Sequence, residues 1–296
     1  MSYDVFFCMR EGASTPSPDA IAEFFRRRPN YTVHDTKAVY RNDDTNVYFS
    51  FDYSPQGPLE KSEEEVSHPA SFNINYNRPF FFALEAAPEL EAFAAAFGFV
   101  VDDPQLHGMG ENSDFSADGF LKGFEAGNLF GVKVMLKHGT PVPGPSSLPR
   151  QQLHAIWRWN YGRKHLQAVV GDNLFVPRIM PLFQAGTILT TAVWGDLVPS
   201  VLPRVDVVLA PLDQFKGLLG KKGAIHILPF EGLSPLLLDF VAGSDPLTHW
   251  HLEYSTPPRS LLKHVRRSSK SKGKLSLVSW DMVIDKELLD SARKKT

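Results

Sequence analysis

The sequence has 296 residues, of which 43% are hydrophobic and 22% charged, with a formal net charge of −2. This is the composition of an ordinary globular protein, so it excludes disorder along the whole length. The small net charge gives no overall attraction to nucleic acid or to an anionic membrane. The apolar runs are also too short to cross a bilayer, which takes roughly 18 or more residues, so we expect no membrane association.

Cys8 is the one cysteine, so no disulfide can form within the chain. The start, Met1–Asp4, lacks the basic segment and apolar stretch of a signal peptide. Both features are typical of a reducing compartment, and we expect a cytoplasmic protein. No pattern calls for a cofactor, and we expect none.

The first part of the chain mixes strands with helices. A helix is predicted over 18–28, because Ser17 suits the N-cap and Pro18 the first helical position. Apolar residues at helical spacing before Gly98 predict another helix over 88–97. Short β-prone runs predict strands over 3–9, 38–41, 47–53, 71–76, 80–84 and 99–101. The order contains the βαββαβ pattern of ferredoxin-like units, with an extra strand.

A helix over 116–126 ended by Gly127 and a strand over 132–136 are predicted next. Residues 139–149 then contain four prolines in eleven residues, which is typical of a stiff linker. We therefore expect an N-terminal unit over 1–138, a linker over 139–149 and a C-terminal unit over 150–296.

The C-terminal unit also mixes helices and strands. We expect helices over 150–161, 234–241, 259–267 and 286–295, and strands over 175–183, 187–194, 205–210, 224–228, 248–254 and 275–283. The predicted fold class is therefore α+β, with a ferredoxin-like N-terminal unit packed with a second mixed α/β unit.

The best metal candidate is the alternating segment His249–Glu253. On a strand, His249, His251 and Glu253 share one face, and two imidazoles with a carboxylate suit Zn²⁺ or Fe²⁺. A metal-dependent hydrolase is the function that such a site would support. The favoured interpretation is plainer, since an alternating strand with its polar face in water explains the same pattern.

Two other segments are candidates for binding. The basic run 263–274 could bind phosphates, but it contains no aromatic residue for stacking on bases. Its Arg266 and Arg267 are also candidate partner-binding residues, because a surface with separate charged patches suits selective protein contacts. A solvated helix end followed by a loop is favoured over a nucleic-acid site. The aromatic group Trp157, Arg158 and Trp159 has the residue types of interface hot spots, although helical spacing also allows a core role.

Motifs that would carry catalysis are missing from the sequence. It has no phosphate-binding Gly-x-x-x-x-Gly-Lys loop, no Gly-x-Ser-x-Gly and no His-Glu-x-x-His. Carboxylates such as Asp102 and Asp103 stand in a turn, where Asp bonds to nearby backbone. Cys8 lies in an apolar strand, where a thiol is usually an inert small hydrophobe.

Three segments carry a resemblance to known proteins: MSYDVFF at 1–7, FNINYNRP at 72–79 and VWGDLVP at 193–199. They resemble a family of bacterial proteins of myxobacterial type, and the Ser-Tyr-Asp start resembles immunity proteins of polymorphic toxin systems. The resemblance implies a protein-binding role in which the chain occludes a cognate toxin. The metal-dependent hydrolase and the nucleic-acid-associated protein remain the alternatives.

Overall fold

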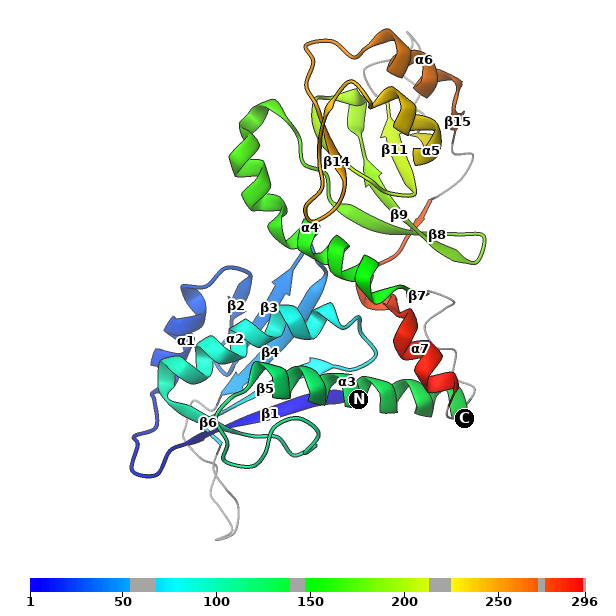
Figure 1. Cartoon of the computed structure of the whole chain (residues 1–296). Coiled ribbons are helices and arrows are strands. Elements are labelled where there is room, and N and C mark those ends of the chain that lie inside the picture. The colour runs from blue at the N-terminus through cyan, green and yellow to red at the C-terminus, as the bar shows by residue number, and fades with distance from the viewer. Residues whose placement is uncertain (54–67, 139–146, 213–224, 271–274, 295–296) are drawn as a thin grey trace. The chain divides into compact units, whose positions relative to one another are not determined.

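The computed structural model describes residues 1–53, 68–138, 147–212, 225–270 and 275–294. By their contacts they form two compact units, Met1–Arg150 with Val283–Thr296, and Gln151–Met282. Both units contain helices and strands, which confirms the α+β class (Figure 1). Within these described ranges, no helix combines the length and the apolar character that crossing a bilayer requires.

The first unit is built on an antiparallel sheet of six strands in the order β2-β3-β4-β5-β1-β6. The predicted strands at 3–9, 38–41, 47–53, 71–76 and 99–101 are all present, and β2 is an addition. The strands are β1 (Ser2–Met9), β2 (Tyr31–Val33), β3 (Lys37–Asn42), β4 (Val47–Tyr53), β5 (Ala70–Asn75) and β6 (Phe99–Asp102). That this unit is ferredoxin-like stays a prediction.

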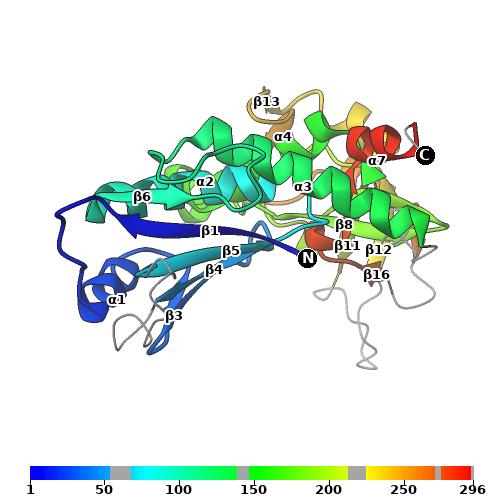
Figure 2. The same ribbon diagram turned by 90° about the horizontal axis from the view of Figure 1, so that it is seen from below.

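The core of the first unit is aromatic and lies between the sheet and its helices. Phe25, Phe51 and Phe93 come from a helix, a strand and another helix, and their ring centroids are 4.8–5.2 Å apart. The helices are α1 (Pro18–Arg26), α2 (Phe81–Phe97) and α3 (Ala117–Lys137). Figure 2 shows α2 and α3 over one face of the sheet. The Ser17 cap of α1 is confirmed, because its Oγ accepts a hydrogen bond from Ala20 N at 3.2 Å.

The predicted strand at 80–84 is wrong, because this apolar run forms the first turns of α2. A short apolar run has no periodicity that separates a buried strand from a buried helix. Helix α2 therefore begins before Pro88, which lies inside it. The early start places Glu85 in the core, where its exposed fraction is 2%.

The predicted helix end at Gly127 and the predicted strand at 132–136 are also wrong, because α3 continues to Lys137. Gly127 is a contact residue rather than a helix terminator. A Cβ atom placed on it would overlap the ring of Tyr76. The glycine therefore marks where α3 lies close against the end of β5.

The end of the chain belongs to the first unit, although the sequence placed it in the second. Helix α7 (Lys286–Arg293) packs Leu288 and Leu289 against Val132 of α3. Just before it, β17 (Ile284–Asp285) pairs in parallel with β7 (Ser147–Leu148), so this part of the expected linker is a strand. The remaining linker residues, 139–146, lie outside the described ranges.

The second unit contains two sheets and a long helix, α4 (Arg150–Val170). The larger sheet has the order β15-β12-β11-β9-β8-β16, and the smaller one the order β10-β14-β13. The strands are β8 (Ile179–Gln184), β9 (Thr187–Val193), β10 (Ser200–Pro203), β11 (Val207–Pro211), β12 (Ile225–Pro229), β13 (Val241–Gly243), β14 (His249–Leu252), β15 (Ser269–Lys270) and β16 (Ser276–Leu277). The short helices are α5 (Phe230–Leu233) and α6 (Arg259–Arg267).

Two predictions for the second unit are wrong. The helix expected over 234–241 is instead α5 followed by a 3-10 turn at Ser234–Leu236 and then β13. The extended segment expected over 275–283 ends after β16, and Trp280–Met282 forms a 3-10 turn. Pro235 lies at the start of the first of these 3-10 turns, where its fixed backbone angle is tolerated. In the second, Trp280 is buried and its Nε1 donates to Ile179 O at 3.2 Å, which holds the turn against β8.

Candidate functional site

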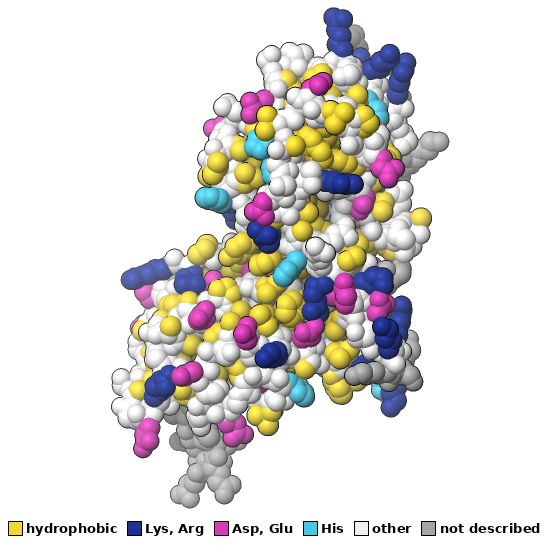
Figure 3. All heavy atoms as spheres, in the orientation of Figure 1, with side chains coloured by type: hydrophobic (Ala, Val, Ile, Leu, Met, Phe, Trp, Pro, Cys, Tyr) yellow, Lys and Arg dark blue, Asp and Glu magenta, His cyan; other side chains and the backbone are white. Residues whose placement is uncertain are grey.

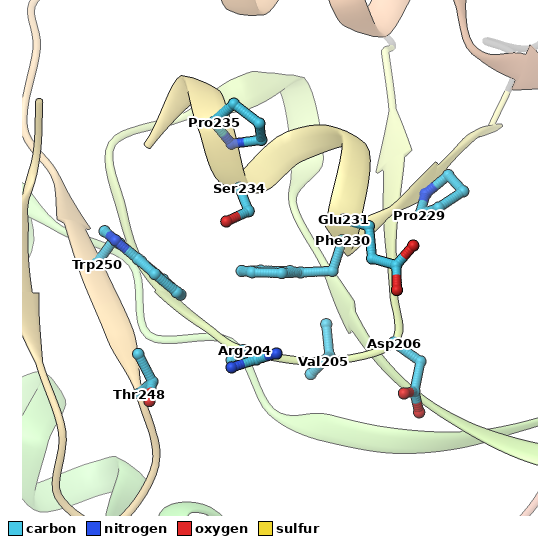
Figure 4. Close-up of a pocket in the computed structure, with 10 residues that line it drawn as sticks. All are labelled: Arg204, Val205, Asp206, Pro229, Phe230, Glu231, Ser234, Pro235, Thr248 and Trp250. Carbon is cyan, nitrogen blue, oxygen red and sulfur yellow. The ribbon is translucent and has the colours of Figure 1, made fainter. Parts of the chain in front are cut away.

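A pocket of about 620 Å³ opens on the second unit. Its lining comes from the turn between β10 and β11, from α5 with the 3-10 turn after it, and from β14. In Figure 4 the Phe230 ring lies across the middle, with Trp250 on one side and the carboxylates of Asp206 and Glu231 on the other. The two rings are 5.3 Å apart between centroids. The site thus combines an aromatic surface with side chains of both charge signs.

The pocket is held by hydrogen bonds that fix its backbone. Arg204 N donates to Thr248 O at 2.7 Å, and Phe230 N donates to Asp206 O at 3.0 Å. The Asp206 carboxylate accepts from the backbone N and the Oγ1 of Thr190, at 2.7 and 2.8 Å. One of its oxygens is therefore already engaged in structure.

Two charged groups of the pocket are still available for a ligand. Arg204 and Glu231 are exposed. Among the residues that the structure describes, neither forms an ion pair. An exposed guanidinium beside an aromatic surface can bind a carboxylate while a nonpolar group packs on the rings.

The predicted metal ligands in β14 do not form a three-ligand cluster. The rings of His249 and His251 lie 5.4 Å apart, as expected for one face of a strand. His249 is buried against Trp159, and its Nδ1 lies 2.8 Å from Leu247 O. Strand β14 ends at Leu252, so the alternation does not extend to Glu253, which is exposed.

The predicted partner residues on α4 have different environments. Trp159 is 2% exposed and its Nε1 donates to Pro177 O at 2.9 Å, so it is a core residue. Arg158 is exposed and pairs with Asp245 at 3.0 Å. Trp157 is half-buried and packs against Tyr161 at 5.6 Å between centroids.

The basic run forms the end of α6 and the strand after it. Arg266 and Arg267 are exposed, while Leu261 and Val265 face the core. Lys and Arg side chains gather over α6 in Figure 3. This agrees with a solvated helix face, and residues 271–274 of the run lie outside the described ranges.

A second polar cluster lies in the first unit, around Cys8. The thiol donates to Asp102 Oδ2 at 3.0 Å, and its Sγ lies 3.2 Å from His68 Nδ1. Across the described ranges, this is the one group of three His, Cys, Asp or Glu residues whose ligand atoms all lie within 4.8 Å of one another. Cys8 lies in the expected apolar strand, but its thiol has polar partners from neighbouring strands. Burial, and next the hydrogen bond to Asp102, raise the pKa of the Cys8 thiol to about 12.

Comparison of the chain with protein-family models, with curated proteins and with solved structures finds no match. The geometry of the two sites is therefore the basis for inferring function.

Sequence reasoning missed most of both sites. Arg204, Phe230 and Trp250 stand at separate places in the chain, and none of them is among the site residues that the sequence predicts. Cys8 and His68 are likewise separated by 60 positions. No spacing motif could have found either group, because strand pairing and helix packing bring the residues together.

Proposed function

We propose that this protein binds a protein partner through the pocket of its second unit, as an immunity-type inhibitor that occludes a cognate toxin. The observation that carries the proposal is the aromatic pair Phe230 and Trp250 beside the exposed Arg204. Trp, aromatic residues and Arg supply most of the binding energy in protein interfaces. The resemblance of the chain start to immunity proteins agrees with this role.

The pocket favours a particular anchor on the partner. Phe230 is 6% exposed and forms a rigid floor, while Trp250 is half-buried and offers part of its ring to a ligand. A nonpolar or aromatic side chain of the partner would pack here. A neighbouring acidic residue of the partner would pair with the Arg204 guanidinium, whose planar donors fit a carboxylate.

The exposed apolar residues of the second unit also suit a protein partner rather than a small metabolite. Hydrophobic side chains are exposed on the face that carries α5 and β14 (Figure 3). Leu238 and Val241, which follow α5 in the chain, are 79% and 73% exposed. Apolar side chains exposed on the same unit could be covered by a protein partner, which a small metabolite could not do.

The first test of this function is binding of the purified product of the adjacent gene to the full chain, measured by calorimetry. We expect a one-to-one complex and survival of cells that produce both proteins. Trp250→Ala and Arg204→Glu should each weaken binding by about 30-fold, the loss of a hot spot worth roughly 2 kcal/mol. Both variants should also lose protection.

Arg259→Glu is the matched control, because it makes the same charge reversal at an exposed arginine of α6 in the same unit. We expect its affinity to stay within about threefold of the original. If the unmodified chain neither binds nor protects against the neighbouring product, the immunity role is wrong. If binding is lost in Arg259→Glu and kept in Arg204→Glu, the pocket is not the interface.

A further inference from the structure

The Cys8 cluster is assembled from three neighbouring strands of the first unit. Cys8 is on β1, Asp102 ends β6, and His68 stands just before β5. The sheet order places β1 between β5 and β6, so the three side chains converge from both sides of the central strand. Tyr3, Val5 and Phe7 of β1 point into the aromatic core. By alternation, Cys8 belongs to the opposite face of the sheet.

The distances between the three ligand atoms of the cluster are close to those around a small bound metal ion. Ligand atoms around a tetrahedral zinc ion, bonded at about 2.3 Å to sulfur and about 2.0 Å to nitrogen or oxygen, lie about 3.5 Å apart. In the structure, Sγ lies 3.0 Å from Asp102 Oδ2 and 3.2 Å from His68 Nδ1. An outward shift of a few tenths of an ångström would make room for the ion.

A cysteine nucleophile activated by histidine is not what this geometry offers. In such a site the carboxylate orients the histidine, whereas here Asp102 accepts the thiol hydrogen itself. That bond favours the protonated thiol, which is a poor nucleophile. A bound cation would replace the thiol proton and satisfy sulfur and carboxylate together.

Two contacts around the cluster hold its ligands in place. The other oxygen of Asp102, Oδ1, accepts from the backbone N of Asn112 at 2.5 Å. The ring of His68 packs on Phe6 with 4.7 Å between centroids. Such outer contacts orient ligands in metal sites. His68 and Phe6 also line a pocket of about 370 Å³ on this unit.

We propose that Cys8, His68 and Asp102 form a Zn²⁺ site whose fourth position is open to water or an added ligand. A thiolate, an imidazole and a carboxylate are a borderline-soft donor set that zinc prefers. Binding releases the thiol proton to solvent, and no other bond changes. This site lies in the first unit and is independent of the proposed toxin-binding pocket.

The test uses the full chain after treatment with a chelator, titrated with Co²⁺ as a spectroscopic probe and then with Zn²⁺ as competitor. We expect saturation at one ion per chain, a thiolate-to-cobalt charge-transfer band and displacement by Zn²⁺. Apparent affinity should rise by up to about tenfold per pH unit between pH 6 and 8, since the thiol proton is lost on binding. Cys8→Ser should abolish the band.

His68→Asn and Asp102→Asn should weaken cobalt binding by at least about tenfold. Two control variants should leave cobalt binding unchanged. They are His107→Asn, at an exposed histidine of the same unit, and His251→Asn, on β14. Circular dichroism of each variant checks that the fold is kept. Absence of stoichiometric Co²⁺ and Zn²⁺ binding to the unmodified chain would overturn the proposal, as would a charge-transfer band that persists in Cys8→Ser.

Discussion

At the residue scale, the buried Glu85 shows how a charged side chain is accommodated in an aromatic core. Its Oε1 accepts hydrogen bonds from Tyr40 Oη and Asn42 Nδ2, each at 2.8 Å, and from Thr45 Oγ1 at 3.1 Å. All three donors are at most 5% exposed. The carboxylate therefore links α2 to β3 and to the turn before β4.

Glu85→Ala should lower the free energy of unfolding by about 2–4 kcal/mol, because it leaves three buried donors without their acceptor. Glu85→Gln keeps an acceptor oxygen and should recover part of the loss. Glu91→Ala is the matched control, since Glu91 lies on the same helix and is exposed. Urea unfolding followed by tyrosine circular dichroism measures all three. Equal effects of Glu85→Ala and Glu91→Ala would contradict the role given to Glu85.

At the element scale, α3 depends on a row of glycines at every fourth position. Gly119, Gly123, Gly127 and Gly131 recur along one side of the helix. A Cβ at Gly123 would meet the hydroxyl of Tyr3, and one at Gly127 the ring of Tyr76. Glycine weakens a helix by about 1 kcal/mol relative to alanine, so packing outweighs propensity here.

Gly127→Ala should destabilise the protein by about 1–3 kcal/mol, because the overlap with Tyr76 exceeds the gain in helix propensity. Gly162→Ala in α4 should instead stabilise the protein. Nothing lies within 4 Å of a Cβ at Gly162, so we expect about 1 kcal/mol of added stability. Thermal unfolding of both variants gives the comparison. A stabilised Gly127→Ala protein would show that α3 can move away from the sheet at little cost.

At the scale of the whole molecule, the two units have different cores. The first is built from Phe and Tyr, whereas all five tryptophans fall in 151–282. Tryptophan fluorescence thus reports on the second unit. In the first unit, burial raises the pKa of Tyr3, Tyr31 and Tyr76 above the ordinary value of 10.0, with Asp103 and Glu89 adding to the effect for Tyr3 and Tyr31.

Alkaline pH should therefore unfold the first unit before the second. A raised folded-state pKa means that the neutral phenol stabilises the fold below pH 10, and that this contribution is lost as pH rises above 10. Above pH 10, each such tyrosine lowers the free energy of unfolding by about 1.4 kcal/mol per pH unit, so the three together lower it by about 4 kcal/mol per unit. The second unit has Tyr254, whose pKa is also raised by burial, and the exposed Tyr161.

The test is a titration between pH 8 and 12 in which the near-UV circular dichroism of tyrosine and the fluorescence of tryptophan are recorded in parallel. We expect the tyrosine signal to be lost at lower pH than the tryptophan signal. Coincident transitions would contradict the separate response of the two cores.

Where neighbouring residues carry the information, the sequence was sufficient. Ser17 and Pro18 set the start of α1, and the β-prone runs at 47–53 and 71–76 form β4 and β5. These features depend on backbone preferences and on side-chain period, both of which act over a few residues. The α+β class follows from them.

Contacts between distant residues decided the rest. The apolar run at 80–84 becomes helix because α2 packs against the sheet, Gly127 lies inside a helix because Tyr76 needs the space, and α7 joins the first unit through Val132. Both candidate sites have the same origin, since Arg204 meets Trp250 and Cys8 meets His68 only after strands pair. The sequence by itself determined the helix cap and the strands whose local pattern is strong. The tertiary structure decided the type of the ambiguous segments and which side chains meet, because the free energy of burial and close packing depends on neighbours that sequence order does not specify.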